Sequence, residues 1–183
     1  GGANLTVGPT SVTPQVSASP SGPVPSIMPP ASATSGNWAG YVYSDSGRTA
    51  GALATSTWVV GNMTCNTRGI VSPWVGFGGD GSNEIAQLGV DYDCRNGSPA
   101  YRVWTEAYPA ASVYYSDKPV NVGDKIVASV TFAGNNSFST KIDNVTQGWT
   151  LSLPMTLSDA TGGEVIVEQV GSEEIPNFDP IVF

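Results

Sequence analysis

Histidine is absent from the 183 residues of this chain. Without an imidazole the chain cannot build a histidine-dependent nucleophile, an imidazole general base, or the histidine ligand sets typical of zinc and copper. Catalysis, if there is any, must therefore use carboxylate, amide and hydroxyl side chains. We expect no metal ion and no cofactor.

Positive charge and long apolar runs are also scarce. Seven Lys and Arg stand against fifteen Asp and Glu, for a net charge of -8, and no basic run exists to bind nucleic acid. No apolar stretch approaches the roughly twenty residues that span a bilayer, and the N-terminus lacks the pattern of a signal peptide. Only 12% of residues are charged, while glycine is abundant. We therefore expect a secreted, extracellular monomer without nucleic-acid or membrane partners. We also expect a processed or recombinant chain, with a segment cleaved from its N- or C-terminal side.

Two cysteines, Cys65 and Cys94, enclose about thirty residues. A bridge between them would stabilise the fold by about 3 to 4 kcal/mol in the chain-entropy model. Neither cysteine belongs to a CxxC pair or lies beside an acidic cluster, which disfavours a redox dithiol or a metal site. We predict a disulfide.

Residues 1–34 differ from the rest of the chain. They hold seven of the fourteen prolines and no charged side chain, a composition that favours extended, polyproline-like backbone. We interpret them as a Pro- and Ser-rich tail, either a remnant of a prosegment or a strap along the body, and we take residues 35–183 as one domain.

From Ser35 onward, short alternating or apolar runs are separated by Gly, Asn, Asp and Pro, without a convincing helical period. This pattern predicts an all-β sandwich of two antiparallel sheets. The predicted strands are Trp38–Tyr43, Ala54–Val60, Ser72–Gly78, Ile85–Tyr92, Tyr101–Tyr108, Lys125–Phe132, Ser137–Asp143, Trp149–Leu153 and Glu164–Gln169. Turns are predicted at residues 121–124 and 134–136.

Three of these strands have a polar face. Side chains alternate along a strand, so one face of 101–108 carries Arg102, Trp104, Glu106 and Tyr108. The same counting groups Ile85, Gln87, Gly89 and Asp91 on a second strand, and Glu164, Ile166 and Glu168 on a third. A face that mixes carboxylates, an amide and aromatic rings is typical of a substrate cleft and too polar for a core.

The order of several short motifs resembles that of a known family, the glutamic peptidases or eqolisins, which are secreted endopeptidases that act in acid. The motifs are Ser35-Gly36-Asn37-Trp38-Ala39-Gly40, Ser56-Thr57-Trp58-Val59-Val60, Trp74-Val75-Gly76, Gln87-Leu88-Gly89-Val90-Asp91, Trp104-Thr105-Glu106-Ala107-Tyr108-Pro109 and Glu164-Val165-Ile166-Val167-Glu168. None is specific alone, but six in family order over residues 35–183 make a chance match improbable.

The resemblance implies two large curved sheets of the concanavalin or jelly-roll type whose concave face holds a catalytic dyad, here Gln87 and Glu168. A glutamate near its free pKa of about 4.3 is partly ionised in acid and can take a proton from water. An amide can orient that water and donate to the oxyanion. Neither a metal nor an acyl-enzyme is needed, and polypeptides are the expected substrates.

The resemblance also places substrate-binding residues around the dyad: Asn37, Trp38, Trp74, Asp91, Trp104, Glu106 and Tyr108. The chain departs from the family at Arg102, where an Asp is common, and we expect Arg102 to pair with Glu106. It departs again at 77–81, where the Asp-Gly that follows the tryptophan motif is displaced, and at its C-terminal end, where family members continue for further strands.

Other interpretations remain open. Gln87 and Glu168 taken singly are ordinary strand residues, and Trp38, Trp58 and Trp74 suit a sandwich core. A jelly-roll glycoside hydrolase would use Glu106 and Glu168 as its paired carboxylates. A carbohydrate-binding or adhesion module would use the aromatic rings to stack on sugars, without catalysis.

Overall fold

Antiparallel strands form almost all of the regular structure. The computed structural model describes residues 15–17, 31–34, 37–43, 50–79, 82–171 and 173–183, and these contain fourteen strands, β1 to β14. The described residues include no helix long and apolar enough to cross a membrane. The all-β prediction is therefore confirmed.

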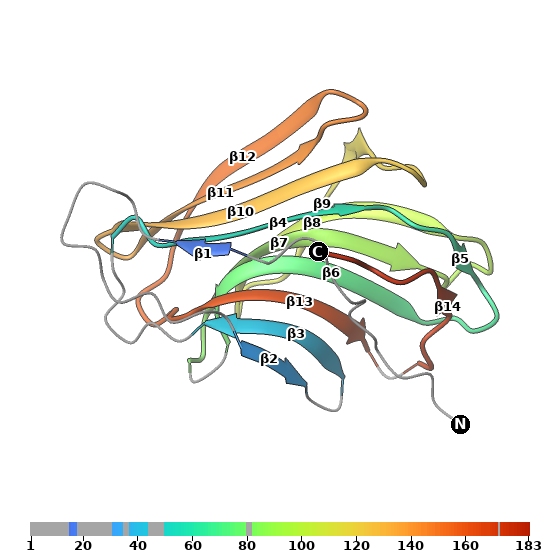
Figure 1. Ribbon diagram of the computed structural model, residues 1–183, viewed down its shortest axis with the longest axis horizontal. Helices are drawn as coiled ribbons and strands as arrows, with labels where there is room; N and C mark the ends of the chain where they lie inside the picture. The colour runs from blue at the N-terminus through green and yellow to red at the C-terminus, as the bar shows by residue number, and fades with distance from the viewer. Residues whose placement is uncertain (1–14, 18–30, 35–36, 44–49, 80–81, 172) are drawn as a thin grey trace.

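The larger sheet has seven strands in the order β2-β3-β13-β6-β7-β8-β9, and Figure 1 shows them as one curved layer. Their bounds are Ala31–Thr34 (β2), Trp38–Tyr43 (β3), Gly163–Val170 (β13), Ile70–Gly78 (β6), Ile85–Asp93 (β7), Ala100–Tyr108 (β8) and Val113–Pro119 (β9). The insertion of β13 between β3 and β6 brings the C-terminal part of the chain to the middle of the sheet.

The second sheet has five strands in the order β1-β4-β10-β11-β12 and faces the first. Its strands are Gln15–Ser17 (β1), Leu53–Val59 (β4), Lys125–Gly134 (β10), Ser137–Asn144 (β11) and Trp149–Thr156 (β12). A small third sheet pairs Met63–Thr64 (β5) with Asn177–Phe178 (β14). The predicted sandwich is thus confirmed.

The hydrophobic core lies between the two large sheets. Val75 and Leu88 are fully buried and pack with Ile142 of the opposite sheet in one cluster. Because side chains alternate along a strand, Trp74 and Gln87 point to the other face of the seven-stranded sheet. β6 is buried along its whole length, since the core covers one of its faces and a second side-chain layer covers the other.

All nine predicted strands are present, with ends that differ by no more than three residues. Five strands were not predicted: β1, β2, β5 and β14, which have four residues or fewer, and β9, whose Asp117, Lys118 and Pro119 are untypical of a strand. Edge strands tolerate such residues, because one side of their backbone has no partner and because charge and proline discourage aggregation.

The turn predictions are also confirmed. Gly123, between β9 and β10, has a φ of 90°, and Gly134, Asn135 and Asn136, between β10 and β11, all have positive φ. Left-handed backbone of this kind favours Gly and Asn, the residues on which the prediction relied.

Only short parts of the predicted tail are described. Residues 15–17 form β1, which pairs with β4, and residues 31–34 form β2, which pairs with β3 at the edge of the larger sheet. The rest of residues 1–34, and also Ser35, Gly36, Asp80 and Gly81 of the quoted motifs, lie outside the described residues.

Candidate active site

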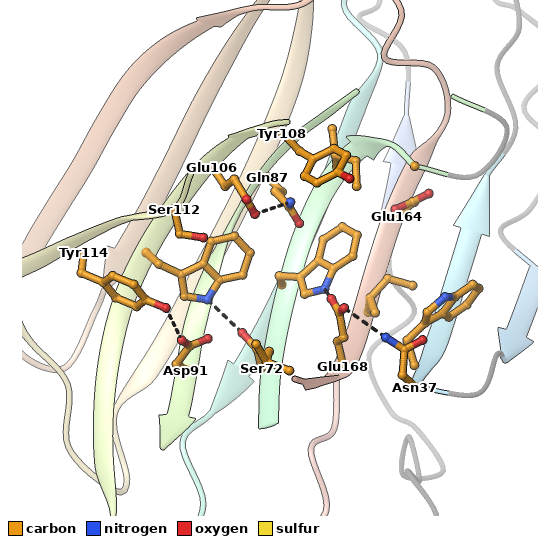
Figure 2. A pocket seen from close by; sticks show the side chains of 17 residues that line it. Asn37, Ser72, Gln87, Asp91, Glu106, Tyr108, Ser112, Tyr114, Glu164 and Glu168 are labelled. Carbon is orange, nitrogen blue, oxygen red and sulfur yellow. Dashed lines mark hydrogen bonds between the residues drawn. The ribbon is translucent and has the colours of Figure 1, made fainter. Parts of the chain in front are cut away.

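A cleft of about 620 Å³ lies over the face of the seven-stranded sheet that is turned away from the core. Trp74, Trp104 and Ile166 pack together as its apolar floor. Figure 2 shows the polar side chains that surround this floor: Asn37, Ser72, Gln87, Asp91, Glu106, Tyr108, Ser112, Tyr114, Glu164 and Glu168. The three polar faces predicted from strand alternation therefore meet at one site.

Strand register places three of these side chains in one row across the sheet, together with Gly76. Glu164 pairs with Gly76, Gly76 with Gln87, and Gln87 with Glu106. A Cβ added at Gly76 would lie 3.0 Å from the Cβ of Gln87. The same Cβ would lie 3.0 Å from Cζ3 of Trp74, so the missing side chain lets the indole pack close to Gln87 on this side, while Glu106 lies on the other.

One hydrogen bond to a described residue holds the side chain of Gln87. Its Nε2 donates a hydrogen bond of 2.9 Å to Oε2 of Glu106, and the side chain is only 5% exposed. This bond fixes which end of the amide faces Glu106 and leaves Oε1 and the second N–H of Gln87 for a ligand.

Two described residues donate hydrogen bonds to Glu168. Trp74 Nε1 donates to its Oε2 at 3.0 Å, and Asn37 Nδ2 donates to its Oε1 at 3.3 Å. Burial raises the pKa of Glu168 and the negative charges of Glu106 and Asp91 add to the rise, while the Trp74 hydrogen bond opposes it. The carboxyl therefore becomes ionised at a higher pH than a free glutamate.

Gln87 and Glu168 share the cleft without touching. Glu168 pairs with Ser72 on β6 and Gln87 pairs with Gly76 on the same strand. Ser72 and Gly76 are four residues apart, which corresponds to about 13 Å of backbone along β6. Figure 2 shows both side chains on the same face of the sheet.

Glu106 lies beside Gln87 in a half-buried position. Burial raises its pKa and the charge of Asp91 adds to the rise, while a hydrogen bond with Ser112 lowers it. In acid, Glu106 is therefore protonated before an ordinary glutamate, and its neutral carboxyl can still accept the hydrogen bond from Gln87.

Asp91 lies deeper, with 2% of its surface exposed. Tyr114 Oη donates to its Oδ2 at 2.7 Å. Burial raises the pKa of Asp91 against the lowering effects of Tyr114, Ser72 and Arg102. Nearby, Trp104 Nε1 donates to Ser72 Oγ at 2.9 Å, which fixes the indole on the floor.

All nine residues predicted for the site line this one cleft. Besides the dyad they are Asn37, Trp38, Trp74, Asp91, Trp104, Glu106 and Tyr108. Tyr108, at 46% exposure, and Asn37 are the exposed residues among these. Their part in binding and catalysis stays a prediction.

The predicted pair of Arg102 with Glu106 is wrong. Arg102 Nη2 instead donates to Asp93 Oδ2. Residues four apart on one strand are separated by about 13 Å, too far for an ion pair. Arg102 is opposite Asp91 on β7, so Asp93 is its diagonal neighbour and within reach of a long side chain.

Sequence analysis missed three polar residues of the cleft. Tyr114 lies on the strand that was not predicted, and Ser112 lies just before it. Ser72 was placed on a strand, but serine carries little signal of its own. Tyr114 and Ser112 can be assigned to the cleft only once the register of β8 and β9 is known, because that register places Tyr114 opposite Trp104.

The cysteines form the predicted disulfide, Cys65 with Cys94, which ties the β5 segment to the end of β7. Within the described residues, no three Cys, Asp or Glu side chains come together as ligands for a metal ion. The polar groups of the cleft are oxygen and nitrogen atoms suited to hydrogen bonding.

Comparison with known proteins agrees with this geometry. The model of the peptidase A4 family matches residues 36–183. Aspergillopepsin-2 of Aspergillus niger is 30% identical over 126 residues, which are 68% of this chain and 39% of that protein. Scytalidopepsin B of Scytalidium lignicola is 33% identical over 101 residues, 52% of this chain and 38% of that protein. The chain thus spans well under half the length of these two relatives.

Among solved structures, scytalido-glutamic peptidase with a transition state analog inhibitor superposes with a TM-score of 0.67 at 26% identity. The match covers 79% of this chain and 75% of that one. The match to the family model spans β3, β6, β7, β8, β9 and β13, the strands that build the cleft. The chain therefore belongs to the peptidase A4 family, the glutamic peptidases or eqolisins.

Proposed function

We propose that this protein is an acid-acting glutamic endopeptidase that hydrolyses peptide bonds in unfolded or loop segments of polypeptides. One observation carries the proposal: in a chain of this family, Gln87 from β7 and Glu168 from β13 line the same cleft. The floor of indole rings below them suits apolar side chains of an extended peptide.

Glu168 is the general base in this proposal. Its ionised carboxylate takes a proton from a water molecule, and the water oxygen attacks the carbonyl carbon of the peptide. The same carboxyl then returns the proton to the leaving nitrogen as the C–N bond breaks. Burial keeps the pKa of Glu168 above that of a free glutamate, so the base works in weak acid, where a histidine would be fully protonated.

Gln87 stabilises the negative oxygen of the tetrahedral intermediate. The N–H that does not bond to Glu106 is free to donate to this oxygen, and Oε1 can accept from the attacking water. Glu106 is a positioning residue, because its bond to Nε2 sets the orientation of the amide. Glu168 is likewise positioned by Trp74 Nε1 and Asn37 Nδ2.

Secretion and a monomeric state belong to the same proposal. Disulfides such as Cys65–Cys94 form and persist in oxidising compartments outside the cytosol. An extracellular enzyme would also meet the acid conditions under which a carboxylate base is useful. For the tail at residues 1–34 the proposal is a strap along the catalytic domain, since its strands β1 and β2 pair with β4 and β3.

The test is an assay at about pH 4, near the pKa of a free glutamate, with an acid-unfolded protein and, separately, with xylan or β-glucan. We expect peptide fragments from the wild type and from Glu173→Gln, which removes an exposed carboxyl outside the cleft. Glu168→Gln should reduce cleavage by at least about a hundredfold, the usual contribution of a general base. Release of sugar, or undiminished proteolysis by Glu168→Gln, would contradict the proposal.

A further inference from the structure

Two arginines meet one aspartate beside the cleft. Arg95 donates to Asp93 Oδ2 from Nη2 at 2.7 Å and from Nε at 3.0 Å, and Arg102 Nη2 donates to the same oxygen. Arg102 lies on β8 two residues before Trp104, and side chains on one strand face recur every second residue. Arg102 therefore points to the same side of the sheet as the cleft floor.

Tyr114 connects the cluster of Arg95, Arg102 and Asp93 to the cleft. The Cζ of Arg102 lies 4.9 Å from the centre of the Tyr114 ring, within the range of a cation–π contact. The hydroxyl of the same tyrosine donates to Asp91, the cross-strand partner of Arg102. Tyr114 and Asp91 both line the cleft, so the guanidinium of Arg102 borders one end of it.

Together, Arg95, Arg102 and Asp93 carry an excess of positive charge in acid. Burial alone would raise the pKa of Asp93, but hydrogen bonds from Arg95 and the charge of Arg102 outweigh burial and hold that pKa below its usual range. Asp93 therefore stays ionised and balances only one of the two arginines. Asp91 does not balance the other, because its raised pKa lets it take up a proton as the pH falls.

Arg102 also has donors to spare. Its side chain is 40% exposed, and one hydrogen bond, from Nη2, joins it to a described residue. Its Nε is buried and has no partner among the described residues. A guanidinium presents five N–H donors in a planar fork, and the ligand that fits this fork is a carboxylate.

We propose that this end of the cleft is a subsite for a carboxylate of the peptide substrate, with Arg102 as the residue that binds it. The carboxylate belongs either to an acidic side chain or to the C-terminus of the peptide. The inference rests on the proposed peptidase function and adds a determinant of specificity to it.

The position of Arg102 limits where in the substrate this carboxylate lies. Arg102 is four residues from Glu106, the neighbour of Gln87, and four residues of strand span about 13 Å. An extended peptide covers the same distance with about four residues. The carboxylate is therefore recognised a few residues away from the bond that is cut.

The test uses two series of fluorogenic peptides at about pH 5, where glutamate side chains are mostly ionised. One series exchanges Glu for Gln at single positions on either side of the cleaved bond, and the other exchanges a C-terminal carboxylate for a carboxamide. We expect the wild type to favour the carboxylate at one position by about five- to thirtyfold in kcat/KM, mainly through KM. The series that shows the preference identifies the source of the carboxylate.

Arg102→Gln should reduce this ratio to within a factor of about two of unity, and Arg102→Lys should keep part of it, since the charge remains but the fork is lost. Lys141→Gln, which removes a charge from β11 in the other sheet, should leave the ratio unchanged. Thermal unfolding of each variant checks that it is folded.

Two results would overturn the subsite. One is a wild-type enzyme that cuts both members of every pair at similar rates, which needs no variant to fold. The other is a carboxylate preference that survives in Arg102→Gln. A complete lack of peptide cleavage by the wild type would instead reject the peptidase function, and the subsite with it.

Discussion

In the proposed mechanism Glu168 is the base, and burial raises its pKa above that of a free glutamate. Burial alone would also weaken the base, because a neutral carboxyl takes no proton from water. Trp74 corrects this with its indole N–H, which stabilises the ionised form. The residue on the floor of the cleft thus has an electrostatic role as well as an apolar one.

Trp74→Phe tests this role. The phenyl ring keeps much of the apolar floor but removes the donor, so the pKa of Glu168 should rise further. In the proposed mechanism activity requires the ionised base, so the acid limb of the pH dependence of kcat/KM should move to higher pH. The matched control is Trp104→Phe, which loses a bond to Ser72 and none to Glu168. An acid limb that stays in place in Trp74→Phe would show that the indole N–H does not set this pKa.

At the residue scale, the side chains that face the cleft were easier to predict than the hydrogen bonds between side chains. Residue type and strand alternation were enough to place Gln87, Glu106 and Glu168 on cleft-facing positions. They did not identify Asp93 as the partner of Arg102, because that contact depends on strand register, which sequence spacing does not reveal.

At the scale of the strand, the cleft floor depends on a glycine between two indoles. Gly89 of β7 pairs with Trp74 on one side and with Trp104 on the other. A Cβ at Gly89 would lie 2.3 Å from the carbonyl oxygen of Pro73 and 2.7 Å from the Cβ of Trp74. The glycine therefore lets three strands bring two large rings together on one face.

Gly89→Ala should accordingly destabilise the protein by about 1 to 3 kcal/mol, since backbone atoms must move to accept the methyl group, and should lower kcat/KM by displacing the indoles. Urea unfolding and peptide hydrolysis measure the two effects. Gly97→Ala is the control, because a Cβ added at Gly97 would meet no atom within 4 Å. This variant should lose about 1 kcal/mol of stability, since alanine is strained at the positive φ of Gly97, and should keep its activity. Wild-type stability and activity in Gly89→Ala would refute this view of the floor.

Strands with strong alternation were predictable, and the edge strand β9 was not. Its omission had a consequence for the site, because β9 brings Tyr114 to Asp91. The order of strands in each sheet was also beyond prediction from local pattern, since the pairing of β13 with both β3 and β6 joins segments far apart in the sequence.

At the scale of the whole molecule, two groups of carboxyls give opposite pH dependences of stability. Glu168, Glu106 and Asp91 have raised pKa values, so their contribution to stability is complete below the ordinary pKa and is lost as the pH rises through the raised values. Asp93 and Asp124 have lowered pKa values, so their contribution is lost as the pH falls through those values. Stability should therefore be greatest near pH 4, about the ordinary pKa of Asp and Glu.

The melting temperature of the wild type should fall as the pH is raised from about 4 to 7, because the cleft carboxyls ionise above their ordinary pKa and the chain approaches its net charge of -8. Glu168→Gln removes one buried ionisable group and should show a smaller fall, whereas Glu173→Gln should follow the wild type. Equal slopes for wild type and Glu168→Gln would show that burial of Glu168 is not linked to stability.

The central claim is that Gln87 and Glu168 act together on one water molecule and one carbonyl group. The most direct measurement is kcat/KM for a single peptide at about pH 4 in Gln87→Ala, Glu168→Gln and the double variant, near the free carboxyl pKa. We predict that each single change costs at least about a hundredfold, and that the double variant is about as slow as the slower single one, because residues that act as a unit are not additive. Near-normal turnover in either single variant, or losses that multiply in the double variant, would contradict the claim.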